Sequence, residues 1–490
     1  MCLTSRPRRL ALAALPSALL LMLGAALPVA LAQNSTLDRA TETLLRDEQL
    51  AHAALGIAVV DLASGEAIKS VNAGRSLVPA SLMKVPTTAT ALAVLGADFR
   101  FETELCYAGA IDGEGTLRGD LLIVGGGDPS LGAGRPGNTL DLDGVLDRWA
   151  RAVADAGIRR VEGSVVGEHS LDPGNEPSPY WQWNDIGNYY GAGAGALNVH
   201  ENYYTLRLQR TAREGGRPQI VGYGPDPGEL RWTNEVASGP AGSGDQSYIF
   251  GAPGTRDRVI RGTIPAGKGV FKVKGSLPDP PERAAAWLTE RLRERGIAVS
   301  GTPAATTEPR GAGAAQLDVL RSASLGELVR LTNYRSVNLF AEAIYEATAR
   351  ALGADPTDQR AVGEAFADYW QRRGVAPAGY EQVDGSGLGM RNLITARQLA
   401  QVLRLSAGDL RQNLPRVGAE GTVRSVMRGQ SRAARIRAKS GTMKRSRGFC
   451  GYATLTDGRE VCFVVMANNF SGSGRALRRK LGDWMGALVE

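Results

Sequence analysis

The chain has 490 residues, of which 43% are hydrophobic and 22% are charged, and its formal net charge is +7. This length predicts about three domains, and the composition is that of an ordinary globular protein. The positive charge is small and dispersed, which argues against a nucleic-acid-binding protein, so we expect no nucleic acid among the partners.

The first 32 residues have the pattern of a secretory signal. Arg6, Arg8 and Arg9 precede an apolar run that ends at Ala30-Leu31-Ala32. A basic start, an apolar middle and a small-x-small end predict a signal peptide at 1–32, cleaved after Ala32, and therefore export to an extracytoplasmic compartment, for which we expect the periplasm. The alternative is an uncleaved membrane anchor, because the run is long enough to span a bilayer. Without this segment, 54 basic and 50 acidic residues remain, a formal charge of +4.

The N-terminal part of the mature chain predicts an amphipathic helix over 36–50 and two strands, over 55–62 and 66–72. A helix carrying Ser81 and Lys84 follows. Pro86 falls within the span of this helix, and a proline in a helix interior would remove a backbone hydrogen bond. Either the first turn is irregular and regular helix begins near Pro86, or the helix is kinked. Both possibilities place Ser81 at an exposed bend.

The spacing of Ser81 and Lys84 is chemically meaningful. Residues three apart share one helix face, so the Lys84 amine can reach the Ser81 hydroxyl. A serine hydroxyl needs a base to become a nucleophile, and a lysine serves as that base only when its pKa is lowered. A helix N-terminus would also stabilise the developing negative charge. Alone, the pair is weak support for catalysis, because two common residues recur at this spacing by chance.

Residues 99–281 predict an insertion of one or two β-rich domains, with short strands, glycine-rich turns and a helix near 141–156. An aromatic cluster lies within it, around Asp185. Such a cluster either caps a core or forms a wall that faces a ligand. Its members are Trp181, Trp183, Tyr189 and Tyr190.

The C-terminal part predicts helices over 282–295, 325–352, 356–373 and 395–405, then strands over 434–443, 447–456 and 459–468. Ser336-Val337-Asn338 is placed in a loop that interrupts the second helix. A closing helix over 475–489 has one apolar face, which we expect to pack on the sheet, although it could instead lie on a membrane surface. The N-terminal strand pair and the C-terminal three strands predict one sheet flanked by helices, a mixed α/β (α+β) fold.

Three cysteines remain after the signal. Cys450 and Cys462 lie on the two arms of a predicted hairpin that turns at Asp457-Gly458, whereas Cys106 has no obvious partner. In an oxidising compartment a disulfide between Cys450 and Cys462 is possible. Buried free thiols are the simpler interpretation.

Three polar motifs occur in the order known from penicillin-interacting serine enzymes: Ser81-Leu82-Met83-Lys84, Ser336-Val337-Asn338 and Lys439-Ser440-Gly441-Thr442. With them the chain resembles the D-alanyl-D-alanine carboxypeptidase/endopeptidase family of class C low-molecular-mass penicillin-binding proteins, peptidase family S13. The long interval between the first two motifs fits this family. The phrases Asp384-Gly385-Ser386-Gly387-Leu388 and Glu420-Gly421-Thr422 also resemble it.

The resemblance implies a penicillin-binding, β-lactamase-like transpeptidase fold with a five-stranded antiparallel sheet. The peptidase domain would comprise 33–98 and 282–490, with 99–281 inserted. The substrates would be peptidoglycan stem peptides, with β-lactams as covalent inhibitors. We expect no metal or other cofactor, because His52, His169 and His200 form no zinc motif. Membrane contact is not expected.

The resemblance also implies roles for individual residues. Ser81 would be the nucleophile and Lys84 its base, Ser336 would relay a proton to the leaving D-alanine, and Asn338 would bind the substrate backbone. Lys439 would supply a positive charge that helps to keep Lys84 neutral.

The third motif and the insertion would bind the substrate. Ser440, Gly441 and Thr442 would hold its carboxylate, and backbone N–H groups of Ser81 and Thr442 would form the oxyanion hole.

Asp185 and Tyr190 would face the amino group of a substrate side chain. The family arginine is displaced, since Met390 stands at its position and Arg391 follows.

Two rival functions stay open. A β-lactamase shares the acylation step but hydrolyses its acyl-enzyme rapidly. A non-catalytic peptidoglycan-binding protein would keep the fold without the chemistry, although retention of Lys84 and Lys439 argues against it.

Overall fold

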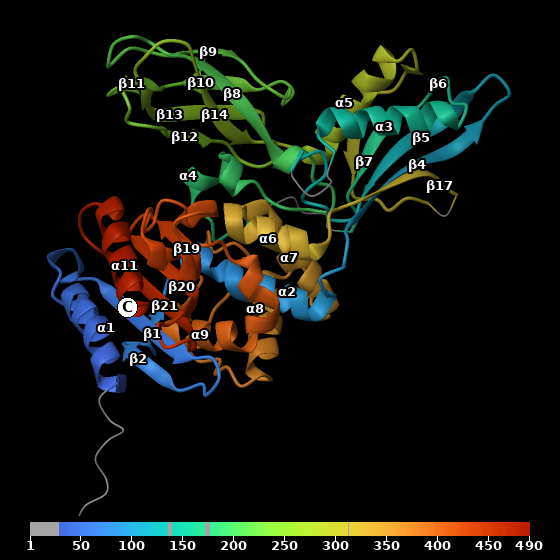
Figure 1. The fold of residues 1–490 in the computed structure, drawn as a ribbon. Coiled ribbons are helices and arrows are strands. Elements are labelled where there is room, and N and C mark those ends of the chain that lie inside the picture. The colour runs from blue at the N-terminus through green and yellow to red at the C-terminus, as the bar shows by residue number, and fades with distance from the viewer. Residues whose placement is uncertain (1–28, 136–139, 172–176, 312) are drawn as a thin grey trace, which may run out of the picture.

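A computed structural model describes residues 29–135, 140–171, 177–311 and 313–490 (Figure 1). Most of the predicted signal peptide lies outside the described residues. Its last four residues, 29–32, belong to the first helix, α1 (Val29–Leu45). The chain forms a sheet domain, built from residues before 96 and after 324, and an insertion between them that stands above it in Figure 1.

The sheet domain is built on five antiparallel strands in the order β19-β20-β21-β1-β2. The predicted union of the N-terminal pair with the C-terminal three is confirmed. Hydrophobic side chains fill the central strand β21, which is buried along nearly its whole length because helices cover both faces of the sheet. The bounds are β1 (Ala54–Asp61), β2 (Ala67–Val71), β19 (Ile436–Met443), β20 (Ser446–Thr454) and β21 (Glu460–Asn468).

One face of this sheet is covered by α1 and the closing helix α11 (Gly474–Leu488). Leu477, Leu481 and Trp484 of α11 are buried against the strands, and the Trp484 indole donates a hydrogen bond to Thr41 of α1. The apolar face of α11 is therefore used within the protein, as expected, and is not free to lie on a membrane. None of the described helices is both long and apolar enough to span a bilayer.

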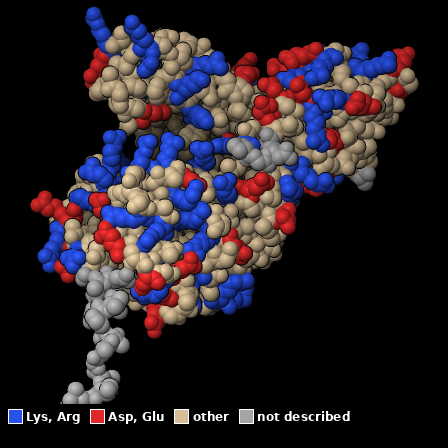
Figure 2. Space-filling model, viewed as in Figure 1, with Lys and Arg blue, Asp and Glu red and all other residues tan. Residues whose placement is uncertain are grey.

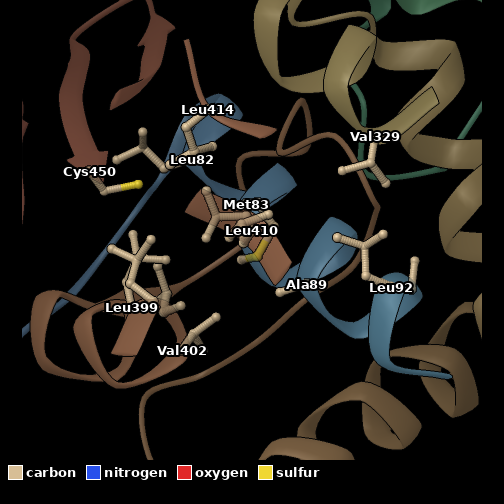
Figure 3. Packing of buried hydrophobic residues seen from close by; sticks show 14 of the residues in the cluster. Leu82, Met83, Ala89, Leu92, Val329, Leu399, Val402, Leu410, Leu414 and Cys450 are labelled. Atoms are coloured by element: carbon tan, nitrogen blue, oxygen red, sulfur yellow. The ribbon is translucent and has the colours of Figure 1, made fainter. Parts of the chain in front are cut away.

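The other face carries the helical layer and the larger apolar core, part of which is drawn in Figure 3. Leu82 and Met83 from the segment before α2 meet Leu399 and Val402 of α9 there, so the core holds the Ser81 turn in place. The helices of this layer are α2 (Lys84–Leu95), α6 (Leu325–Arg335), α7 (Asn338–Ala351), α8 (Gln359–Gln371), α9 (Ala396–Leu405) and α10 (Ala407–Leu410). A short two-stranded ladder joins β3 (Ser76–Leu77) to β18 (Ile394–Thr395).

The insertion has two lobes that share one apolar core. The first lobe is a seven-stranded sheet covered by α3 (Leu142–Asp155) and α5 (Pro280–Glu294). Its strands are β4 (Glu102–Ile111), β5 (Thr116–Gly125), β6 (Arg160–Val161), β7 (Val165–Glu168), β15 (Ala298–Val299), β16 (Ala304–Thr306) and β17 (Ala315–Arg321).

The second lobe carries two smaller sheets. They contain β8 (Tyr203–Gln209), β9 (Gln219–Gly222), β10 (Arg231–Asn234), β11 (Ala237–Gly239), β12 (Gln246–Phe250), β13 (Asp257–Pro265) and β14 (Val270–Ser276).

The insertion ends later than the predicted boundary at 281. β17 pairs with β4, with Arg321 opposite Glu102, and α5 packs on the first lobe. The helix predicted over 282–295 therefore belongs to the insertion and not to the sheet domain. Its amphipathic pattern is local and does not reveal which sheet it covers.

The cysteines at 106, 450 and 462 are buried free thiols. Cys450 lies opposite Val464, and Cys462 lies opposite Tyr452, so the two cysteines do not face each other across the hairpin.

Candidate active site

Ser81 lies on a tight turn at the edge of the core. Residues Ala80–Met83 form one turn of 3-10 helix, and regular α-helix begins at Lys84. This is the first of the two arrangements predicted from Pro86, an irregular turn followed by regular helix. Pro86 falls in the first turn of α2, where a missing N–H removes no helical hydrogen bond. Ala80 has a φ of 51°, a conformation that an L-residue adopts only under constraint. The turn leaves the Ser81 side chain half-buried beside Lys84.

Lys84 is completely buried, and its amine has three oxygen neighbours. The Nζ atom is 3.3 Å from Oγ of Ser81, 2.7 Å from Oδ1 of Asn338 and 2.8 Å from the carbonyl oxygen of Ser386. A protonated amine has three N–H donors, which match these three acceptors. A neutral amine has a lone pair instead of one donor, and that lone pair can take the proton of the Ser81 hydroxyl.

Burial lowers the pKa of Lys84 to about 8, although the carboxylates of Glu342 and Asp384 oppose this shift. Lys439 is also fully buried, and its pKa lies well below the ordinary value because of burial and of repulsion by Lys84. Burial is thus the main cause of the low pKa of Lys84. From the sequence we had expected the positive charge of Lys439 to contribute to this shift.

Ser336 and Asn338 lie at the junction of α6 and α7, where the sequence predicted a loop between two helices. Ser336 ends α6 in the left-handed conformation, with a φ of 58°, and Asn338 is the first residue of α7. Their side chains meet different lysines. Oγ of Ser336 accepts a hydrogen bond from Lys439 at 2.9 Å, whereas Asn338 accepts one from Lys84.

The third motif lies on β19. Oγ of Ser440 is 2.9 Å from Oγ1 of Thr422, and Oγ1 of Thr442 accepts a hydrogen bond from Arg447 at 2.6 Å. A Cβ atom at Gly441 would lie 2.6 Å from the carbonyl oxygen of Pro79, so only glycine lets this strand approach the Ser81 turn so closely. The structure therefore brings the three motifs together around Ser81.

The insertion contributes Asp185, in the short helix α4 (Trp183–Ile186), and Tyr190. The Tyr190 hydroxyl donates to Oδ1 of Asp185 at 3.3 Å, and the Tyr190 carbonyl accepts a hydrogen bond from Nδ2 of Asn338 at 2.7 Å. Burial raises the pKa of Asp185, while the Tyr190 hydrogen bond lowers it. Tyr190 thus contacts Asn338 directly, and Asp185 contacts the Tyr190 hydroxyl.

The sequence left two interpretations of the aromatic cluster open, a cap on a core or a wall that faces a ligand, and its members differ in which of the two they fit. Trp181 is buried and its indole donates to Asp384 at 2.8 Å, which is a structural role. Trp183 and Tyr189 are 57% and 49% exposed and are free to contact a ligand.

Arg391 does not face this group. It pairs with Glu381 and stacks over Tyr180.

Sequence reasoning missed two buried acids that hold the Lys84 site together. Glu342 accepts hydrogen bonds at 2.8 Å from the backbone N–H groups of Gly385 and Ser386, and Ser386 in turn accepts from Lys84. Burial and the charge of Asp384 raise the pKa of Glu342 to about 8. The sequence spacing could have indicated this residue, because Glu342 lies four residues after Asn338 and therefore on the same face of the helix.

Asp384 is the second of these acids. It accepts from Trp181, from the backbone N–H groups of Gly387 and Gly389 and from Asn392. It opens the Asp384-Gly385-Ser386-Gly387-Leu388 phrase, whose role the sequence did not reveal. Among the described residues, no cluster of histidine, cysteine or acidic side chains could hold a metal ion.

The sequence of the chain is similar to those of known D-Ala-D-Ala carboxypeptidases. Residues 37–487 match the sequence model of the D-Ala-D-Ala carboxypeptidase 3 (S13) family. The D-alanyl-D-alanine carboxypeptidase of Actinomadura sp. (strain R39) is 31% identical over 491 residues, covering 95% of this chain and 87% of that protein. The D-alanyl-D-alanine carboxypeptidase DacB of Haemophilus influenzae is 24% identical, over 85% of this chain and 86% of its own.

A solved structure shares the fold. The crystal structure of penicillin binding protein 4 from Haemophilus influenzae matches with a TM-score of 0.78 at 21% identity, covering 93% of this chain and 99% of that one. The fold expected from the resemblance is therefore confirmed.

Proposed function

Because the chain belongs to the D-Ala-D-Ala carboxypeptidase 3 (S13) family, we propose that it is a serine-type D-Ala-D-Ala carboxypeptidase. Its substrates are peptidoglycan stem peptides, and the same chemistry would serve an endopeptidase that cuts cross-links. The observation that carries the proposal is the buried Lys84 amine, 3.3 Å from the Ser81 hydroxyl and with its pKa lowered to about 8.

Acylation begins when neutral Lys84 takes the proton of Ser81. The Ser81 oxygen attacks the carbonyl carbon between the two D-alanines, and the backbone N–H groups of Ser81 and Thr442 stabilise the oxyanion. As the C–N bond breaks, the leaving amine needs a proton. Ser336 donates it and is resupplied by Lys439, whose amine is 2.9 Å away.

Deacylation repeats these roles with water as the nucleophile. After the leaving D-alanine has departed, Lys84 gives up the Ser81 proton to solvent and Lys439 regains the proton that it supplied. Neutral Lys84 then takes a proton from the water, which attacks the ester carbonyl, and Ser81 leaves with that proton, returned by the same amine. A β-lactam acylates Ser81 in the same way, but its leaving nitrogen stays tethered to the adduct.

Substrate binding is shared between the third motif and the insertion. Ser440, Gly441 and Thr442 bind the carboxylate next to the leaving nitrogen, and Asn338 binds the peptide backbone. Asp185, with Tyr190 beside it, faces an amino group on the stem-peptide side chain, an ion pair that partial burial would strengthen.

We also propose export to the periplasm, where peptidoglycan is accessible. The basic and apolar pattern of 1–32 supports this. N-terminal sequencing of the protein from a periplasmic fraction is expected to begin at Gln33. A mature chain that still begins at Met1 would contradict cleavage.

The activity is tested by measuring D-alanine released from a stem pentapeptide by the purified protein and by its Ser81→Ala variant. We expect release by the first and none by the second. Undiminished release by Ser81→Ala would remove the nucleophile assignment, and no release by either protein would point to the non-catalytic binding function.

A further inference from the structure

Arg447 lies beside the hydroxyl groups of the third motif and has no role in the chemistry described above. It stands on β20 directly opposite Thr442 of β19, and its Nη1 atom donates a 2.6 Å hydrogen bond to Oγ1 of Thr442. A threonine hydroxyl has one hydrogen to donate and two lone pairs. Because Arg447 occupies a lone pair, the Thr442 hydrogen is left to point towards an acceptor elsewhere.

A second pair of hydroxyls is arranged in the same way. Thr422 and Ser440 lie 2.9 Å apart, so one donates to the other and one hydroxyl hydrogen stays available. Arg478 of α11 holds the backbone of this pair in place, because its Nη2 atom donates to the Thr422 carbonyl at 2.6 Å. Two hydroxyl hydrogens beside these arginines are therefore available to an acceptor. A carboxylate only accepts hydrogen bonds, so it can bind both of them.

The charge of these arginines is not balanced within the described residues, where neither Arg447 nor Arg478 forms an ion pair with an acid. Burial lowers the pKa of both, and repulsion from Arg478 lowers that of Arg447 further. Nε of Arg447 is buried without a hydrogen-bond partner. Its guanidinium also packs against Gly474, the first residue of α11, where the helix dipole is positive.

An unbalanced, partly buried cation is costly unless an anion joins it. Figure 2 shows that lysine and arginine side chains gather along the edge of the sheet domain that faces the insertion, above α11 and β19. The field along this edge attracts anions to the hydroxyls.

We propose that Arg447 is a positioning residue for the substrate carboxylate: it orients the Thr442 hydroxyl and, with Arg478, supplies the positive charge that the carboxylate neutralises. This inference rests on the proposed function. It predicts that the enzyme discriminates sharply between a free carboxylate and an uncharged amide next to the leaving nitrogen.

The test compares diacetyl-L-Lys-D-Ala-D-Ala with its C-terminal amide, measuring D-alanine or D-alaninamide release by mass spectrometry. For the acid peptide, we expect Arg447→Gln to lower kcat/KM by about 10- to 100-fold, which is the loss of one charge-assisted interaction. For the amide peptide, we expect Arg447→Gln to change kcat/KM by less than about threefold, because the amide carries no charge for Arg447 to neutralise.

Arg447→Lys, which keeps the charge, should recover part of the activity on the acid. The control is Arg479→Gln. Arg479 is an exposed neighbour of Arg478, so this substitution also removes one positive charge, and it should leave kcat/KM unchanged for both substrates.

Equal losses on acid and amide, or no loss on either, would overturn the inference and leave Arg447 a purely structural residue. Thermal unfolding of each variant shows whether the fold is kept. If Arg447→Gln unfolds, Arg447→Lys is compared with the wild type instead. It must then lower kcat/KM for the acid more than for the amide. Equal losses of kcat/KM on the two substrates would overturn the inference. A wild-type protein that releases no product would remove the proposed function together with this inference, whereas an active wild type tests the inference alone.

Discussion

The amine of Lys84 lies closer to Asn338 than to the serine that it activates. Nζ is 2.7 Å from Oδ1 of Asn338 and 3.3 Å from Oγ of Ser81. The side chain is therefore held mainly by Asn338 and the Ser386 carbonyl, and Ser81 is its most weakly bound partner. A base held by other groups keeps its position while the serine proton moves.

The pH dependence of acylation should report Lys84. With a pKa of about 8, the neutral amine makes up about a tenth of the enzyme at pH 7 and half at pH 8. Only the neutral form accepts the serine proton, so the second-order rate of acylation by benzylpenicillin should rise about fivefold between these pH values and level off above 9. Stopped-flow measurements check this, and a rate that is flat from pH 6 to 9 would contradict Lys84 as the base.

Replacement of Glu342 by glutamine should move that inflection to lower pH. The Glu342 carboxylate stabilises the charged form of Lys84, so its removal lowers the pKa of Lys84 below about 8. The variant should also lose about 1 to 3 kcal/mol of stability, because a backbone N–H group of the Gly385–Ser386 loop loses its acceptor.

The matched control is Glu364→Gln, an exposed glutamate on α8. It should leave the pH profile unchanged. An unshifted inflection in Glu342→Gln would mean that Glu342 is already protonated when Lys84 titrates.

Asp185→Asn should remove a preference for substrates with a charged side chain. We expect the wild type to cleave a stem peptide with a free side-chain amine about tenfold faster than its N-acetylated form, since a partly buried ion pair contributes on this order. The variant should cleave both at similar rates, compared by kcat/KM. A preference that survives in Asp185→Asn would show that another group binds the amine.

Leu481→Ala tests the packing of the closing helix. Leu481 is fully buried between α11 and the sheet, so its truncation should destabilise the protein by about 2 to 5 kcal/mol in urea unfolding. Leu405→Ala, at a leucine that is 49% exposed, should cost much less. Similar midpoints for the two variants would contradict the buried position of Leu481.

The parts of the fold that local patterns govern could be predicted from the sequence. Ser81 and Lys84 are three residues apart, so their contact needs no tertiary information. The irregular turn before α2 is one of the two arrangements that Pro86 predicted. The alternation of apolar residues predicted β19, β20 and β21, and the break at Ser336-Val337-Asn338 was placed between two helices, as observed.

The parts that depend on contacts between distant residues could not be predicted. The predicted C-terminal boundary of the insertion, residue 281, was wrong. The pairing of β17 with β4, which sets Arg321 opposite Glu102, cannot be recognised from the sequence of either strand alone. Glu342 resembles any acid on an amphipathic helix until the loop at Ser386 folds onto it. Arg447 was overlooked for a similar reason, since only the register of β19 and β20 places it opposite Thr442.

The most direct test of the central claim is the intact mass of the purified mature protein after brief exposure to benzylpenicillin, with peptide mapping of any adduct. We predict a lasting mass increase of one drug molecule, located on Ser81 and lost in Ser81→Ala. An unmodified protein with the drug hydrolysed would identify a β-lactamase. An unmodified protein with the drug intact would contradict the acyl-enzyme chemistry altogether.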